Sequence, residues 1–222
     1  YYTRINAANP MVCENNFYTM EGLVYTSDGT EYTQLVKEEL GLKDSDGVTP
    51  ARVDADLAEQ YKQQAIEELT ALGVEFPVVA DYYISASSQT ALDTANVLKQ
   101  LFTDCLGDDF VTLNIKTYIS SVAKEVRSPQ LASFYINGWG ADYGDPQNYL
   151  GQETAGNDTA YYTRTLSNVN DLVEDETNAD LLAKYAEFTQ MVADADAIHD
   201  DLDARYEAFA KAEAYLIQHA LT

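Results

Sequence analysis

A strand, a helix and a second strand follow one another between residues 76 and 115, and this order constrains the fold. Residues 76–84 form a nearly continuous apolar run, typical of a strand that is covered on both faces. Residues 89–106 have helical apolar spacing and are followed by Gly107, a common helix stop. Residues 110–115 alternate between apolar and polar side chains, as strands do. The order predicts a βαβ unit with a right-handed crossover, and therefore an α/β fold with a mainly parallel sheet.

Further helices are predicted on both sides of this unit. Four segments have apolar side chains at helical spacing: residues 33–40, 54–72, 178–193 and 201–220. Asp54 or Asp56 is a suitable cap for the second of them. Residues 144–170 are rich in Gly, Asn, Asp and Thr, which indicates a surface loop. A short helix is expected within it, beginning at Pro146 and capped by Asp145.

Composition excludes several classes of function. The chain has 13 basic and 37 acidic residues, a net charge of -24, and such a surface repels nucleic acids and anionic lipids. Its two histidines have no metal-ligand spacing, and the acidic run at 194–203 lacks the glycine and terminal glutamate of a calcium loop, so neither a metal nor a cofactor is predicted. Cys13 and Cys105 are interpreted as unpaired, with one long-range disulfide left open. No apolar stretch is long enough to cross a bilayer.

The most distinctive segment is residues 137–146, Asn-Gly-Trp-Gly-Ala-Asp-Tyr-Gly-Asp-Pro, which follows the β-prone run 131–136. It contains the only Trp, three Gly and two Asp. A strand that runs into Gly-Trp-Gly exposes backbone N–H and C=O groups beside a flat aromatic ring. This arrangement suits an extended peptide ligand, whose ammonium Asp142 could bind. The alternative is a glycine-rich strand end with a buried Trp.

Residues 139–150 resemble the W-x-x-D-[YF]-x-[DE]-P signature of the solute-binding proteins of oligopeptide and dipeptide ABC transporters. Residues 32–40 and 72–78 resemble segments of the peptide-binding lipoproteins of Gram-positive bacteria, and residues 203–216 resemble the closing helix of that family. The resemblance covers residues 32–222, whereas residues 1–31 match poorly.

The resemblance implies a lobe of the type II periplasmic-binding-protein fold, with a mainly parallel sheet flanked by helices. Proteins of this family are more than twice as long as this chain. Residues 1–222 are therefore expected to be the C-terminal lobe of a two-lobed protein that closes over its ligand by hinge motion, with the other lobe outside this sequence.

The resemblance also implies roles for individual residues. Asp142 matches the acid that pairs with the α-ammonium of the peptide. Gly138 and Gly140 match positions whose backbone pairs with the main chain of the ligand, and Trp139 matches the aromatic residue that lines a side-chain pocket. Arg127 is a weaker match to the basic residue that some members place upstream for the ligand carboxylate, because the intervening residues differ.

The function implied is that of an extracellular oligopeptide-binding component of an ABC importer, not an enzyme. The expected partners are a peptide ligand and a membrane permease. The expected parent is a monomer tethered to the cell surface by a lipid anchor, or a periplasmic protein in a Gram-negative organism. Two alternatives stay open: the same fold binding an oligosaccharide or another solute, and a carbohydrate hydrolase that uses the carboxylates of Asp142 and Asp145.

Overall fold

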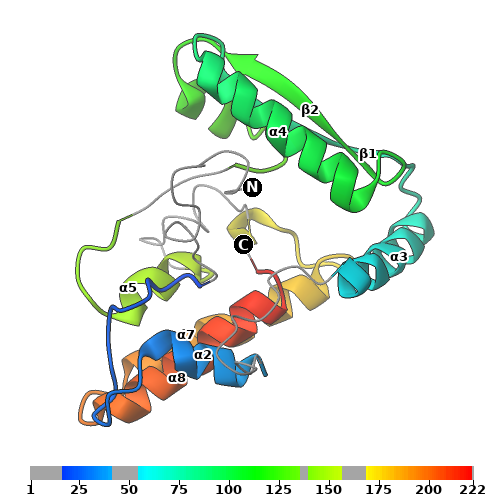
Figure 1. Cartoon of the computed structure of the whole chain (residues 1–222). Coiled ribbons are helices and arrows are strands. Elements are labelled where there is room, and N and C mark those ends of the chain that lie inside the picture. Colours follow the sequence, from blue (N-terminus) through cyan, green and yellow to red (C-terminus); the bar gives the residue numbers. More distant parts are fainter. Residues whose placement is uncertain (1–16, 42–54, 136–139, 157–168, 222) are drawn as a thin grey trace. The chain divides into compact units, whose positions relative to one another are not determined.

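The computed structural model describes residues 17–41, 55–135, 140–156 and 169–221. The chain divides into two compact units, each of which is described by itself. The first unit comprises residues 1–14 and 51–138, and the second comprises residues 15–50 and 139–222. Figure 1 shows the described helices and strands in both units.

The first unit contains α3 (Ala55–Ala71), β1 (Val78–Ser85), α4 (Gln89–Leu106), β2 (Val111–Tyr118) and a π-helix (Ala123–Arg127). β1 and β2 pair in parallel, from Val78 opposite Val111 to Ser85 opposite Tyr118, and α4 connects them. The predicted βαβ unit is therefore confirmed. Ser88 begins α4 by accepting the Ala91 N–H at 3.1 Å, and Gly107 ends it with a φ of 83°.

The two faces of this parallel pair differ. On the face that α4 covers, Ile84 and Leu113 are buried. On the opposite face Val79 is 58% exposed, and Asp81 accepts hydrogen bonds from Asn114 Nδ2 at 2.7 Å and Lys116 Nζ at 2.6 Å. The prediction that residues 76–84 are covered on both faces is therefore wrong. Its apolar run is interrupted at Asp81, and that carboxylate needs polar partners and water rather than a second apolar layer.

The described part of the β-prone run, residues 131–135, lies beside β1 but is not a strand. Ser133 donates its N–H to the Asp81 carbonyl at 2.9 Å, whereas the Asp81 N–H goes to Ser133 Oγ at 2.9 Å instead of to a backbone carbonyl. A side-chain oxygen thus takes the place of a ladder acceptor and stops regular pairing. Phe134 fixes the segment by stacking on Tyr82 and Phe102, with ring centroids 5.2 and 5.8 Å away.

The second unit contains α2 (Tyr32–Glu39), α5 (Pro146–Leu150), α7 (Ala179–Asp196) and α8 (Leu202–Gln218), with short 3₁₀ turns at Gly151–Glu153 and Val169–Asp171. α7 and α2 both pack against α8. Large buried side chains of these helices form the core, among them Tyr32, Val36, Leu150, Phe188, Phe209 and Leu216. The predicted helices are confirmed to within three residues at each described end. Asp201 caps α8 by accepting the Ala204 N–H at 3.0 Å.

One buried carboxylate joins the beginning of the second unit to its last helix. Glu213 of α8 is completely buried and accepts four hydrogen bonds. They come from the Tyr18 N–H at 2.7 Å, the Thr19 N–H at 3.1 Å, Thr19 Oγ1 at 2.7 Å and the Tyr32 hydroxyl at 2.9 Å. These donors satisfy a charge that would otherwise be costly to bury, and they tie residues 18–32 to α8. Within the described ranges, no helix is long and apolar enough to span a membrane.

Candidate ligand-binding site

The distinctive segment lies mostly in the second unit, where residues 140–150 are described. Gly138 and Trp139 lie outside the described residues, so their predicted roles stay predictions. Gly140 is exposed, and a Cβ atom placed on it would meet no atom of the described residues within 4 Å, apart from its chain neighbours. Its surroundings therefore leave room for a ligand backbone to approach, although Gly140 has no positive φ that would require glycine.

Asp145 begins α5, as the sequence predicts. Its backbone is extended, its Oδ1 accepts the Gln147 N–H at 2.9 Å, and Pro146 occupies the first turn. An acidic cap both satisfies a free N–H and lies favourably at the positive end of the helix dipole. The prediction of a short capped helix at this point is therefore confirmed.

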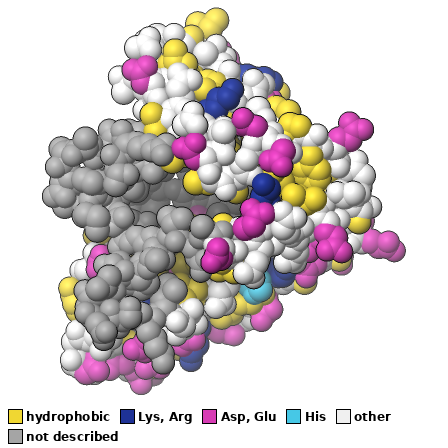
Figure 2. Space-filling view, turned by 45° about the vertical axis from the view of Figure 1, so that its right-hand side comes forward, with side chains coloured by type: hydrophobic (Ala, Val, Ile, Leu, Met, Phe, Trp, Pro, Cys, Tyr) yellow, Lys and Arg dark blue, Asp and Glu magenta, His cyan; other side chains and the backbone are white. Residues whose placement is uncertain are grey.

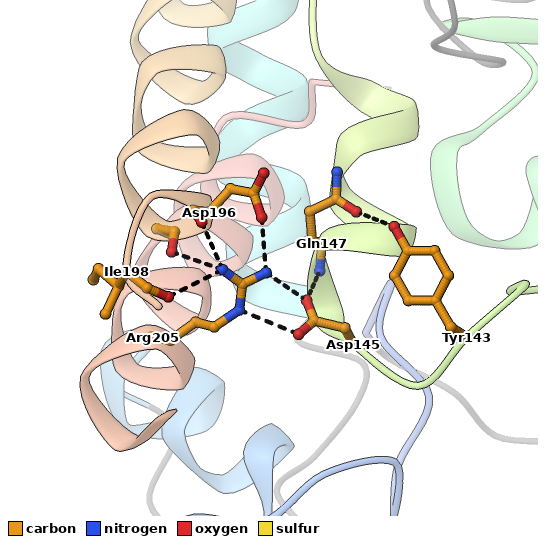
Figure 3. A network of polar contacts seen from close by, with 7 residues as sticks. Tyr143, Asp145, Gln147, Asp196, Ile198 and Arg205 are labelled. Atoms are coloured by element: carbon orange, nitrogen blue, oxygen red, sulfur yellow. Dashed lines mark hydrogen bonds and ion pairs between the residues drawn. The ribbon is translucent and has the colours of Figure 1, made fainter. Parts of the chain in front are cut away.

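The sequence does not reveal the partner of Asp145, which is Arg205 of α8. Figure 3 shows the guanidinium between the two segments. Arg205 Nε donates to Asp145 Oδ2 at 3.2 Å, and a terminal nitrogen donates to Oδ1 at 3.1 Å. The side chains of Arg205 and Asp145 are only 10% and 21% exposed. This bidentate, poorly solvated ion pair fixes the orientation of the guanidinium relative to the carboxylate as well as the distance between them.

Arg205 also binds the end of α7. One terminal nitrogen donates to the backbone carbonyls of Ala195 at 3.2 Å, Asp196 at 2.8 Å and Ile198 at 3.3 Å, and the other donates to the Asp196 carboxylate at 2.8 Å. The guanidinium carbon lies 4.8 Å from the centre of the Phe209 ring. A cation at the carbonyl end of a helix is favoured by the helix dipole. One side chain thus links the end of α7, α8 and the start of α5.

Asp142 is held by its backbone rather than by its carboxylate. Its N–H donates to Asn148 Oδ1 at 2.7 Å, and Asn148 is almost completely buried in α5. Asp142 itself is exposed, and its carboxylate makes no hydrogen bond or ion pair to any other described residue. The neighbouring Tyr143 is 53% exposed and donates its hydroxyl to Gln147 Oε1 (Figure 3).

The two aspartates of the segment therefore have different environments. Both oxygens of Asp145 are occupied by Arg205, and one of them also accepts the Gln147 N–H. A hydrolase would need the second carboxylate to act on the substrate as an acid, a base or a nucleophile. The geometry argues against that use of Asp145 and leaves Asp142 as the available carboxylate of the segment.

Arg127 belongs to the first unit, whereas Asp142 belongs to the second. Arg127 ends the π-helix, and its guanidinium carbon lies 5.5 Å from the centre of the Tyr135 ring. Its Nε is buried and has no hydrogen-bond partner among the described residues. Its predicted role at the ligand carboxylate stays a prediction.

The described histidine and cysteine side chains do not gather into a metal site. Among the described residues, no group of three or more His, Cys, Asp or Glu side chains could hold a metal ion. The ring of His219 packs against Tyr215, with centroids 4.3 Å apart. Cys105 is an exposed free thiol in the described part of the chain, and its interpretation as unpaired stays a prediction. Cys13 lies outside the described residues.

Comparison with known proteins gives no match to a family model. Curated relatives do match. The chain is 27% identical over 191 residues to the oligopeptide-binding protein AliB of Streptococcus pneumoniae, covering 83% of this chain and 28% of AliB. It is 28% identical over 216 residues to the oligopeptide-binding protein SarA of Streptococcus gordonii, covering 88% of this chain and 31% of SarA. The chain thus spans less than a third of the length of these relatives.

Solved structures share the fold. A peptide-binding protein of a peptide ABC transporter superposes with a TM-score of 0.63 at 18% identity, over 93% of this chain and 76% of that protein. The substrate-binding domain of an oligopeptide ABC transporter from Bacillus anthracis gives a TM-score of 0.60 at 20% identity, over 90% of this chain and 32% of that protein. These likenesses confirm the predicted fold class of a type II periplasmic-binding-protein lobe. The chain is therefore similar in sequence to oligopeptide-binding proteins and similar in fold to peptide-binding proteins of ABC transporters, and these similar proteins are substrate-binding proteins rather than enzymes.

Proposed function

We propose that this chain is the C-terminal lobe of an extracellular substrate-binding protein that captures oligopeptides for an ABC importer. The names of the relatives support the ligand class, and their greater length supports the assignment as one lobe of a two-lobed protein. In this proposal the complete protein is a monomer, is tethered to the cell surface by a lipid anchor or is periplasmic, and delivers its peptide to a membrane permease.

The observation that carries the proposal is the environment of Asp142. Its backbone is fixed by Asn148, while its side chain is exposed and its carboxylate forms no hydrogen bond or ion pair with the other described residues. A carboxylate held in this way can accept the charge-assisted hydrogen bonds of a peptide α-ammonium. In the same proposal Gly138 and Gly140 pair with the ligand backbone, Trp139 lines a side-chain pocket, and Arg127, the weaker assignment, binds the ligand carboxylate.

The surface charge favours a ligand with a cationic end. The net charge of the chain is -24. On the face shown in Figure 2, acidic side chains are spread over the described surface and basic ones are fewer. Such a field attracts an ammonium group and repels polyanions. Binding of an oligosaccharide by the same fold is the alternative, and its ligand has no charged end that Asp142 would recognise.

A double-mutant cycle on the full-length two-lobed protein tests the role of Asp142. Titration calorimetry compares one free and one N-acetylated peptide on the unmutated and the Asp142→Asn proteins. Because each change removes one partner of the same buried pair, each should cost about 2 to 5 kcal/mol, or roughly 30-fold to several thousand-fold in affinity. The two losses should overlap rather than add.

An exposed acid of the same unit provides the control. Asp180 is 80% exposed at its side chain and pairs with Lys184 one turn away, so Asp180→Asn should change neither affinity nor the effect of acetylation. If acetylation weakens binding to Asp142→Asn as severely as to the unmutated protein, Asp142 is not the ammonium partner. If neither change affects affinity, the ligand is not a free peptide.

A further inference from the structure

We propose that Arg205 and Asn148 are positioning residues that hold the Asp142 carboxylate where a ligand ammonium can reach it. Neither residue touches the ligand in this proposal. Arg205 holds the start of α5 on α7 and α8, and Asn148 of α5 holds the backbone of Asp142. The inference rests on the proposed function of Asp142 as the ammonium anchor.

The first step is the attachment of Arg205 to a rigid framework. Phe188 of α7 and Phe209 and Leu216 of α8 are completely buried, so the two helices form a packed base. Arg205 binds three carbonyls at the end of α7 while its own backbone belongs to the first turn of α8. A guanidinium has a fixed planar fork, so contacts on one side restrict the direction of those on the other.

The second step is the placement of α5. The free edge of the guanidinium meets both oxygens of Asp145, the cap residue of α5, at 3.1 and 3.2 Å. Because α5 is only the five residues Pro146–Leu150, it is too short to be stable by itself. Its position therefore depends on its capping pair with Arg205 and on the burial of Pro146 and Leu150.

The third step fixes the backbone of Asp142 relative to α5. Asn148 lies three residues after the cap, is 7% exposed, and accepts the Asp142 N–H on Oδ1 at 2.7 Å. On the N-terminal side of Asp142, no described residue other than the chain neighbours of Gly140 lies within 4 Å of a Cβ atom placed on Gly140. Among the described residues, the hydrogen bond that the Asp142 N–H donates to Asn148 Oδ1 is thus a contact that fixes the direction in which Asp142 leaves the α5 segment.

Positioning of this kind has a signature that simple stabilisation does not have. A side chain that only stabilises the fold changes the melting temperature, and it leaves the preference of the folded protein for a free over an acetylated peptide unchanged. A side chain that positions the anchor reduces that preference, because a binding group held loosely loses most of its advantage.

The experiment measures this preference, defined as the Kd for an N-acetylated peptide divided by the Kd for the same free peptide. Titration calorimetry is carried out on the full-length protein, well below the melting temperature of each variant. The variants are Asn148→Ala, Asn148→Asp, Arg205→Met and Arg205→Lys. Lys211→Met is the matched control, since Lys211 is an exposed cation on the same helix α8.

Asn148→Ala removes the acceptor and should reduce the preference about fivefold to tenfold, the equivalent of one hydrogen bond. Asn148→Asp keeps an acceptor oxygen and should restore it. Arg205→Met should reduce the preference at least as much as Asn148→Ala, and Arg205→Lys, which lacks the planar fork, should not restore it. Lys211→Met should leave the preference unchanged.

The outcomes separate this inference from the proposed function. A large preference in the unmutated protein that survives both Asn148→Ala and Arg205→Met overturns the positioning role while leaving Asp142 as the anchor. Equal weakening of both peptides by these variants also overturns it, because the residues would then support the fold alone. A preference near one in the unmutated protein refutes the anchor itself. If Arg205→Met does not fold, the pair Asn148→Ala and Asn148→Asp decides the question.

Discussion

Replacing Asp145 separates two contributions that its carboxylate makes to the stability of the second unit. It accepts the Gln147 N–H at 2.9 Å as the cap of α5, and it faces Arg205 with both oxygens. Asp145→Asn keeps an acceptor for the cap, because Asn is about as good a cap as Asp, but removes the charge opposite Arg205. Asp145→Ala removes both contributions.

The structure sets the size of each loss. A hydrogen bond to a charged group contributes about 1.5 to 3 kcal/mol. Arg205 keeps Asp196 and three backbone carbonyls, so the value expected for Asp145→Asn is near the lower end, about 2 kcal/mol. Asp145→Ala should cost about 3 kcal/mol, because loss of the cap adds roughly 1 kcal/mol.

Urea unfolding of the chain, followed by far-UV circular dichroism, measures these losses. Asp180→Asn is the control, because its exposed pair with Lys184 should contribute less than about 0.5 kcal/mol. Combining Asp145→Asn with Arg205→Met should cost less than the sum of the single changes, since both remove the same pair. If Asp145→Asn is as stable as the unmutated chain and Asp145→Ala loses only about 1 kcal/mol, the pair with Arg205 contributes nothing to the free energy of unfolding and Asp145 acts only as a helix cap.

Two further predictions concern pH and the isolated chain. Burial raises the pKa of Glu153 to about 8, so the stability that its protonated form contributes is complete below its usual pKa of 4.5 and is lost as the pH rises towards 8. The midpoint of urea unfolding should therefore fall over that pH range. Glu153→Gln should make the midpoint depend less on pH, whereas Glu207→Gln, at an exposed position, should not. The same pH dependence in these two variants and in the unmutated chain would disprove the assignment. The 222-residue chain by itself should bind free peptides no tighter than millimolar, because the proposed second lobe supplies much of the surface that encloses a ligand. Micromolar affinity in calorimetry would contradict this expectation.

Features with local causes could be predicted from the sequence. The βαβ unit follows from apolar spacing and a glycine stop, and the Asp145 cap follows from its place directly before Pro146. From that cap alone, Asp145→Ala would be expected to cost about 1 kcal/mol. The larger cost of about 3 kcal/mol expected for Asp145→Ala includes the loss of the pair with Arg205, which lies 60 residues further along the chain.

The partners in long-range polar contacts could not be predicted, although the sequence gives a weak indication that Arg205 and Glu213 make such contacts. Arg205 and Glu213 stand at helical spacing around Phe209, on the apolar stripe of α8, and a charged residue in such a stripe indicates a buried partner. The spacing does not tell which partner it is. The described part of the β-prone run 131–136 is not a strand for a related reason, because strand propensity does not show that Ser133 Oγ replaces a backbone acceptor.

The division of the chain has a consequence for the order in which it can fold during synthesis. The second unit is interrupted, since residues 51–138 of the first unit stand between its two parts, 15–50 and 139–222. Tyr32 and Val36 of α2 are buried in a core that includes α8, and the Tyr32 hydroxyl donates to Glu213 of α8. A ribosome makes α8 after both α2 and the βαβ unit, so the apolar side chains of α2 stay exposed during synthesis while the contiguous βαβ unit is already complete. The nascent chain is therefore expected to acquire protease resistance in the βαβ unit first, and in α2 only after α8 has emerged.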